Sequence, residues 1–143
     1  MREVPGDDAI VAAVRKALPD VVGIWFYGSA AQGRAGPESD LDIGVLGGAR
    51  YDFDQLWKAT CDLVEELCWE PIDLVDLRDA GLPLRFGIVS EGRRLWALDP
   101  KAADMLENSA IGMFQRDRVQ RSQDIAMWLE RFRRGFDLTG AGH

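Results

Sequence analysis

Hydrophobic residues along the chain follow two patterns, one typical of helices and one typical of buried strands. Segments in which apolar residues recur three or four positions apart predict helices at residues 8–18, 53–68, 83–92 and 99–134. Short, mainly apolar runs predict strands at residues 21–27, 41–46, 72–77 and 93–98. The order of these segments predicts an α/β or α+β domain, in which helices flank a mixed four-stranded sheet.

The ends of the predicted helices carry capping residues. Asp7 is expected to cap the first helix, and Asp52 is followed three positions later by Gln55, which is the spacing of a capping box. Pro83 fits the first turn of the third helix, and Gly92 is placed to end it. One face of the second helix is expected to be buried, and it comprises Phe53, Leu56, Trp57, Thr60, Leu63, Val64, Leu67 and Cys68.

Length and composition favour a single folded domain. The chain has 143 residues, of which 47% are apolar and 29% are charged, as in ordinary globular proteins. Residues 1–98 are expected to form the core, and residues 99–143 a helical extension of the same domain. No apolar run approaches the ~20 residues that span a bilayer, and the N-terminal segment lacks the features of a signal peptide.

The two cysteines lie in one predicted helix. Cys61 and Cys68 are seven positions apart, which separates them by two turns, or ~10 Å. That distance is too long for a disulfide. Both are therefore expected to be reduced core residues of a cytoplasmic protein.

The net charge of −7 argues against general binding to nucleic acids. Acidic residues dominate residues 1–110, whereas residues 111–143 carry an excess of basic residues. A cation site is therefore expected in the first part. The arginines of the tail are either a solvated helix face or a surface for a protein partner, and they are Arg116, Arg118, Arg121, Arg131, Arg133 and Arg134.

Three aspartates at the starts of predicted strands are candidate metal ligands. Asp40 and Asp42 flank Leu41, so the alternation of side chains along a strand places both carboxylates on one face. Asp73 enters the next strand and joins them if the two strands are neighbours. Carboxylates this close repel each other unless a cation lies between them. Oxygen-rich sites of this kind favour Mg²⁺.

A Gly-Ser turn follows the first predicted strand. Gly28 allows a ligand to approach the backbone closely, and the N–H groups of the turn and the Ser29 hydroxyl can hold phosphate oxygens. Ser39 is expected either to contact a metal-bound phosphate through water or to cap the turn at Asp40. Phosphates beside a Mg²⁺ site indicate phosphoryl or nucleotidyl transfer, in which two metal ions can hold the attacking and leaving oxygens.

These segments resemble the polymerase-β-like nucleotidyltransferases, and among them the minimal nucleotidyltransferases (MNT). The resemblance is carried by GSAAQGRAGPESDLDIGV at residues 28–45 and by IDLVDL at residues 72–77. A Gly-Ser pair after an apolar strand, a ten-residue gap, Asp-x-Asp and a further acidic strand together form a specific motif. The order of elements matches over residues 8–98 and implies the mixed sheet flanked by helices of that superfamily.

The resemblance also implies roles for the turn. Gly28 and Ser29 would hold the triphosphate of ATP. The sequence departs from the family at one place, because members often carry a basic residue just before the second glycine of the turn. This chain has Gln32 there, and Arg34 follows Gly33 instead.

The roles of the aspartates follow from the same resemblance. Asp40 and Asp42 would coordinate Mg²⁺, with two ions expected, and Asp73 would be the third carboxylate and help to activate the attacking hydroxyl. Asp76 is the alternative third carboxylate. It lies three positions further along the strand, on the opposite face.

MNT proteins of this size are often antitoxins paired with a small, all-helical HEPN toxin. The resemblance therefore implies transfer of AMP from ATP to a hydroxyl of that toxin, with tyrosine as the expected acceptor, and a hetero-oligomer with the toxin. One alternative is a non-catalytic antitoxin that masks its toxin by binding. Another is an adenylyltransferase for a small molecule such as an aminoglycoside. Membrane association and direct nucleic-acid binding are not expected.

Overall fold

The computed structural model describes residues 3–34, 36 and 39–112, and the description below is confined to them. The chain divides into two compact units, Met1–Ile111 and Gly112–His143. Residues 99–111 therefore belong to the first unit. The helix predicted beyond residue 112, with its arginines, lies outside the described residues.

As predicted, the first unit is built on a mixed four-stranded sheet, and the order of its strands is β3-β2-β1-β4. Its strands are β1 (Val21–Tyr27), β2 (Leu41–Gly47), β3 (Ile72–Asp76) and β4 (Arg93–Ala97). Strands β2 and β3 are parallel, whereas β1 is antiparallel to both β2 and β4. The condition set by the sequence, that the two acidic strands be neighbours, is therefore met.

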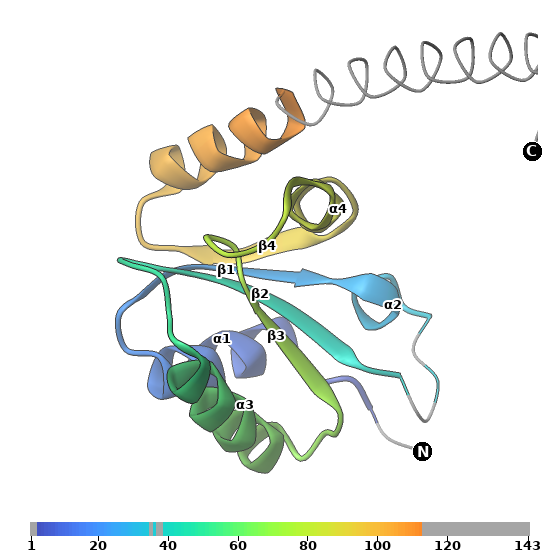
Figure 1. Ribbon diagram of the computed structural model, residues 1–143. Helices are drawn as coiled ribbons and strands as arrows, with labels where there is room; N and C mark the ends of the chain where they lie inside the picture. Colours follow the sequence, from blue (N-terminus) through green and yellow to red (C-terminus); the bar gives the residue numbers. More distant parts are fainter. Residues whose placement is uncertain (1–2, 35, 37–38, 113–143) are drawn as a thin grey trace, which may run out of the picture. The chain divides into compact units, whose positions relative to one another are not determined.

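Helices cover both faces of this sheet (Figure 1). One face carries α1 (Asp7–Ala17) and α3 (Phe53–Leu67), and the other carries α4 (Leu82–Glu91). The single turn α2 (Gly28–Ala31) directly follows β1. A further helix begins at residue 100 and is described as far as residue 112. No helix among the described residues is long and apolar enough to cross a membrane.

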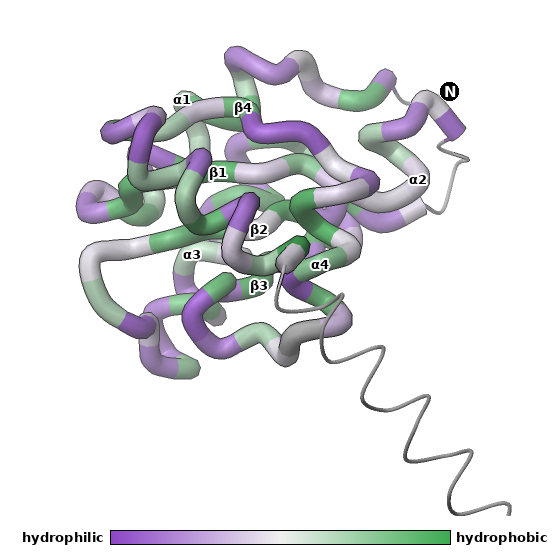
Figure 2. Tube along the Cα trace, turned by 90° about the horizontal axis from the view of Figure 1, so that it is seen from above, coloured by the Kyte–Doolittle hydropathy of each residue, from purple (hydrophilic) through white to green (hydrophobic). Residues whose placement is uncertain are grey.

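Two clusters of buried side chains lie on opposite faces of the sheet. The larger cluster joins the sheet to α1 and α3 and includes Ile10, Val14, Leu41, Ile43, Val45 and Leu63, all fully buried. The smaller cluster comprises Trp25, Leu77, Ile88 and Ala103. Hydrophobic positions accordingly follow the central strands, while hydrophilic positions gather in the outer turns (Figure 2). Leu41, Ile43 and Val45 are thus buried on the face of β2 opposite to Asp42.

The capping predictions have two outcomes. The capping box of α3 is confirmed, because the Asp52 carboxylate accepts from the Gln55 N–H at 2.7 Å and the Gln55 side chain accepts from the Asp52 N–H at 2.9 Å. The prediction that Asp7 caps α1 is wrong. Gly6 occupies the N-cap without a side-chain hydrogen bond, and Asp7 lies in the first helical turn. Its carboxylate is bound by Arg93 from β4, a contact that local sequence does not reveal.

The predicted buried face of α3 is too wide. Phe53 is 78% and Trp57 62% exposed, whereas Leu63 is fully buried. Trp57 lies six positions before Leu63, a rotation of about 120° around the helix axis, which turns it away from the sheet. Cys61 and Cys68 are free thiols, as expected for reduced cysteines, but both are exposed and not part of the core.

Candidate active site

Three strands place Tyr27, Asp42 and Asp73 side by side. In the strand register Tyr27 pairs with Asp42, and Asp42 pairs with Asp73. Paired residues on adjacent strands lie ~5 Å apart and project to the same side of the sheet. That side is the one covered by α4, because a Cβ at Gly44, two positions after Asp42, would meet Ile88 of α4 at 3.4 Å.

Gly28 brings the backbone of α2 against this row of side chains. Its φ of +79° lies in the left-handed region. A Cβ built on Gly28 would lie only 2.1 Å from the Asp42 Oδ2 atom, which is far inside van der Waals contact. Only glycine therefore fits at this position without a shift of the Asp42 carboxylate or the turn. Ser29 is the next residue of the same turn.

The side chains of the row interact electrostatically. Burial and the neighbouring carboxylates, first Asp73 and then Asp40, raise the pKa of Asp42 to about 6. Burial, followed by the charges of Asp73 and Asp42, raises the pKa of Tyr27 above its ordinary value. Tyr27 is thus a neutral phenol at physiological pH, placed beside two carboxylates whose repulsion a cation would relieve.

The donor set fits Mg²⁺ only in part. Within the described ranges, no group of three or more His, Cys, Asp or Glu side chains is arranged as a metal site. Asp42 and Asp73 are nevertheless register neighbours. Mg²⁺ at nucleotide sites is usually held by one or two carboxylates together with substrate phosphates and water. The pair therefore suits an ion that arrives with a nucleotide, and the full ligand set of Asp40, Asp42 and Asp73 stays a prediction.

The loop before β2 holds Ser39 and Asp40. The Ser39 hydroxyl accepts a hydrogen bond from the Gly36 N–H at 2.7 Å, and the Ser39 carbonyl accepts from Trp69 Nε1 at 2.9 Å. Both contacts organise the turn that leads to Asp40, which is itself exposed. Of the two roles expected for Ser39, the structure contains the turn-capping one, and its contact with phosphate stays a prediction.

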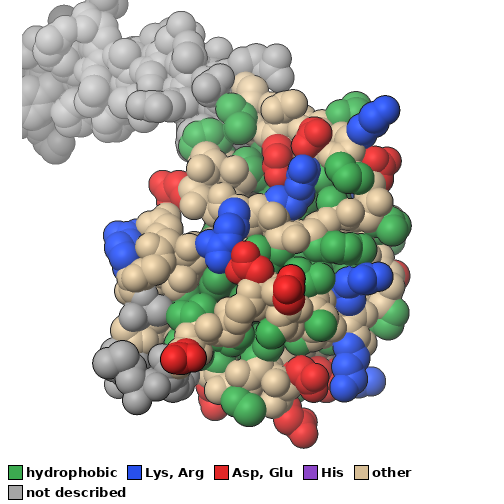
Figure 3. Space-filling view, turned by 180° about the vertical axis from the view of Figure 1, so that it is seen from behind, with side chains coloured by type: hydrophobic (Ala, Val, Ile, Leu, Met, Phe, Trp, Pro, Cys, Tyr) green, Lys and Arg blue, Asp and Glu red, His purple; other side chains and the backbone are tan. Residues whose placement is uncertain are grey.

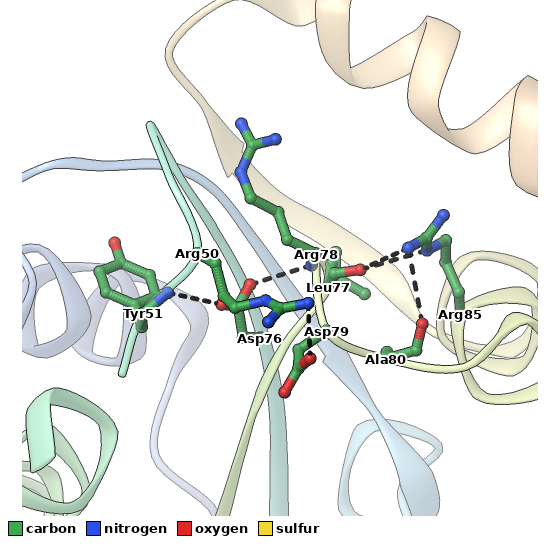
Figure 4. Close-up of polar contacts among 8 residues, drawn as sticks. All are labelled: Arg50, Tyr51, Asp76, Leu77, Arg78, Asp79, Ala80 and Arg85. Atoms are coloured by element: carbon green, nitrogen blue, oxygen red, sulfur yellow. Dashed lines mark hydrogen bonds and ion pairs between the residues drawn. The ribbon is translucent and has the colours of Figure 1, made fainter. Parts of the chain in front are cut away.

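Asp76 lies apart from the row of Tyr27, Asp42 and Asp73. Its side chain is on the opposite face of the sheet and only 3% exposed. Its two carboxylate oxygens accept from the Tyr51 N–H at 2.8 Å and the Arg78 N–H at 2.9 Å (Figure 4). Asp76 therefore anchors two backbone segments, which favours Asp73 as the third carboxylate of the site.

Separate substitutions of Asp76 and Asp73 distinguish a residue that stabilises the fold from a residue of the candidate site. Asp76→Asn should lower the free energy of unfolding by ~2 kcal/mol, because the amide nitrogen would face a buried N–H donor. Asp73→Asn on the same strand should leave stability nearly unchanged, because its side chain is exposed. Urea unfolding of the two variants measures both values. Equal losses of stability would contradict the anchoring role of Asp76.

The raised pKa of Asp42 predicts a pH-dependent effect on the stability of the free chain. The folded-state pKa of about 6 exceeds the ordinary value of 3.8, so the folded state binds the proton more tightly. As the pH rises from about 4 to about 6, the free energy of unfolding therefore falls. Above this range the full cost of ionising the partly buried Asp42 is present. Asp42→Asn removes this penalty, and solvent screening limits the gain to a small rise in Tm.

Thermal unfolding without Mg²⁺ measures this gain. The Tm of Asp42→Asn should exceed that of the unsubstituted chain at about pH 7.5, and the difference should disappear near pH 4. A difference of equal size at both pH values would show that the substitution acts through packing and not through charge.

Two residues near the site have no role in the sequence analysis. Tyr27 is the last residue of a predicted strand and directly precedes Gly28. This position is the only feature of the sequence that could have indicated its place in the site. Arg93 begins β4 and reaches α2, where its Nη1 atom donates to the Ala31 carbonyl at 2.7 Å. The sequence pattern contains no sign of that contact, since the two residues are 62 positions apart.

Charged side chains of both signs lie on one face of the molecule (Figure 3). On the face turned away from the view of Figure 1, acidic and basic side chains are interspersed among hydrophobic ones (Figure 3). A surface made for nucleic acid would instead gather its basic residues into a patch or stripe.

Comparison with known proteins places this geometry among nucleotidyltransferases. Residues 10–101 match the family described as Polymerase beta, Nucleotidyltransferase. The chain is 30% identical over 119 residues to "Protein adenylyltransferase MntA" of Shewanella oneidensis, covering 83% of this chain and 84% of the relative.

Solved structures show the same fold. A chain in the crystal structure of a toxin–antitoxin pair with AMP-PNP superposes with a TM-score of 0.77 at 28% identity, covering 87% of this chain and 99% of the other. A chain in the complex of the tri-AMPylated Shewanella oneidensis HEPN toxin with its MNT antitoxin gives a TM-score of 0.69 at 26% identity. This match covers 86% of this chain and 95% of the other.

Proposed function

This chain belongs to the polymerase beta nucleotidyltransferase family, and we propose that it transfers AMP from ATP to a tyrosine hydroxyl of a cognate HEPN toxin in the cytoplasm. In this role it is the antitoxin of a toxin–antitoxin pair and assembles with its toxin. The observation that carries the proposal is the contact of Gly28 with Asp42, which in turn pairs with Asp73. This close approach places the turn, which we propose holds phosphate, next to the carboxylates, which we propose hold the metal.

The backbone of the turn and its side chains bind the nucleotide. The N–H groups of Gly28 and Ser29 and the Ser29 hydroxyl hold phosphate oxygens, with Ser39 nearby. Asp40, Asp42 and Asp73 hold Mg²⁺, with two ions expected. When bound, Mg²⁺ neutralises the phosphates and lowers the pKa of an oxygen that it contacts. In the free chain burial and the charges of Asp73 and Asp40 raise the pKa of Asp42. In the complex with Mg²⁺ and nucleotide, the same negative charges attract the cation.

The reaction is an in-line displacement at the α-phosphorus of ATP. The acceptor oxygen forms a bond to this phosphorus, the bond to the bridging oxygen of the β-phosphate breaks, and pyrophosphate leaves. Asp73 receives the proton of the acceptor hydroxyl. Asp73 suits this role because it is exposed on the same face as Asp42, where an acceptor can approach it.

The test is a transfer assay with the partner encoded next to this chain. The chain is mixed with Mg²⁺, ATP labelled on the α-phosphate and the purified partner, and mass spectrometry locates the added AMP. Label on a tyrosine of the partner is the expected result. Label on the partner in the absence of this chain, or no label with both proteins present, would overturn the proposal. Neutralisation of the partner without label would instead identify an antitoxin that masks by binding.

A further inference from the structure

Arg93 connects three elements that are distant in sequence. Its Nη2 and Nε atoms donate to the two carboxylate oxygens of Asp7 in α1, at 2.7 and 3.2 Å. Its Nη1 atom donates to the carbonyl of Ala31, the last residue of α2, at 2.7 Å. The guanidinium also lies 5.2 Å from the centre of the buried Phe26 ring. All five of its N–H donors are directed from one rigid plane, which fixes the relative positions of its partners.

Helix α2 depends on such an external contact. It has a single turn of four residues, too short to be stable alone. The carbonyls of its first three residues accept from N–H groups directly downstream, at Gln32, Gly33 and Arg34. The carbonyl of Ala31 is instead held by Arg93, from the edge strand β4. Arg93 therefore ties the end of α2 to the body of the domain.

We propose that Arg93 is a positioning residue for the nucleotide: by holding Ala31 it fixes the turn of Gly28 and Ser29 against Asp42. This proposal rests on the proposed function, because it assigns phosphate binding to that turn. The backbone at Gly28 already lies close to the Asp42 carboxylate, since a Cβ built there would be 2.1 Å from Oδ2. Without the contact from Arg93 the turn is free to shift from this position, and its N–H groups then lose their alignment with the phosphates.

Arg93→Gln tests this role, and Arg94→Gln is its matched control. Arg94 is the next residue of β4 and forms its ion pairs with Asp104 at 2.9 Å and Glu107 at 3.7 Å, on the helix that begins at residue 100. The KM for ATP should rise about tenfold in Arg93→Gln, with a smaller change in kcat, because a charge-assisted hydrogen bond is lost from the binding turn. Arg94→Gln should keep the KM within about twofold.

Two further variants separate positioning from stability. Arg93→Lys keeps one donor for Ala31 and should recover part of the loss in KM. Asp7→Asn removes the ion pair with α1 but leaves the donor to Ala31, so its KM should change less than that of Arg93→Gln. A residue of merely structural importance would reduce the active fraction, which lowers kcat at unchanged KM. If Arg93→Gln does not fold, the comparison of Arg93→Lys with Arg94→Gln decides the question.

Calorimetric titration with Mg²⁺ and an ATP analogue that carries a methylene group in the α–β bridge, so that AMP cannot be transferred, provides a readout that does not need the partner. Binding about tenfold weaker in Arg93→Gln than in Arg94→Gln supports the positioning role, even if no partner is labelled and the proposed function fails. Equal KM values and equal affinities in these two variants overturn the positioning role while leaving the proposed function intact. Absence of nucleotide binding by the unsubstituted chain overturns both.

Discussion

Asp42→Asn is expected to lower the rate of AMP transfer by at least about 10³-fold while the chain stays folded. Asparagine has nearly the same shape as aspartate but no charge, so its neutral amide oxygen holds a divalent cation beside the triphosphate much more weakly. Asp42 pairs with Tyr27 on one side and Asp73 on the other, and its Oδ2 atom faces Gly28. No other described carboxylate occupies this central position, so the loss should not be compensated by a neighbour.

The measurement is the initial rate of label transfer at saturating ATP and Mg²⁺. Asp62→Asn is the control, because Asp62 is an exposed carboxylate of α3, on the opposite face of the sheet. It removes the same charge and should retain full activity. A rate for Asp42→Asn within tenfold of the unsubstituted chain would refute the assignment of Asp42 as a metal ligand, given that stability is retained.

Gly28→Ala should lower the rate by at least about 10²-fold, because small displacements of a catalytic group have effects of this size. The added methyl group would lie 2.1 Å from Asp42 Oδ2, so either the carboxylate or the turn must move. Both belong to the proposed binding site, and movement of either separates the phosphates from the metal ligands. The left-handed backbone adds a conformational cost of ~1–2 kcal/mol to the substitution.

Gly33→Ala isolates the collision from the conformational cost. Gly33 has a φ of +75°, close to the +79° of Gly28, yet no atom of the described residues lies within 4 Å of a Cβ built on it. Gly33→Ala should therefore show the conformational cost alone in urea unfolding and keep its activity, while Gly28→Ala should lose at least as much stability and most of its activity. If Gly33→Ala were equally inactive, backbone strain and not the contact with Asp42 would be the cause.

The direction in which Asp42 and Asp73 point could be predicted from a local rule, whereas their pairing depended on β2 and β3 being neighbours. Alternation along β2 and β3 fixes which side Asp42 and Asp73 face, and the register of adjacent parallel strands brings them together. The same rule separates Asp73 from Asp76, which the structure places on the opposite face and buries. Side-chain parity is a property of any strand and needs no knowledge of the tertiary fold.

What could not be predicted depends on contacts between distant segments. The apolar pattern of α3 does not reveal how much of the helix the sheet covers, so Phe53 and Trp57 were assigned to the core although both are exposed. Asp7 has the residue type of a helix cap, but its carboxylate is taken by Arg93, 86 positions away. Such competition between a local role and a distant partner is decided only when the chain is folded.

The strand order has a consequence for the size of the acceptor. In the described part of the chain β3 is an outermost strand, and Asp73 on it is exposed. In the proposed reaction, an acceptor hydroxyl can therefore approach Asp73 from the edge of the sheet. Side-on access of this kind suits an acceptor carried on the surface of a folded macromolecule, whereas a small metabolite would need further walls to hold it in place.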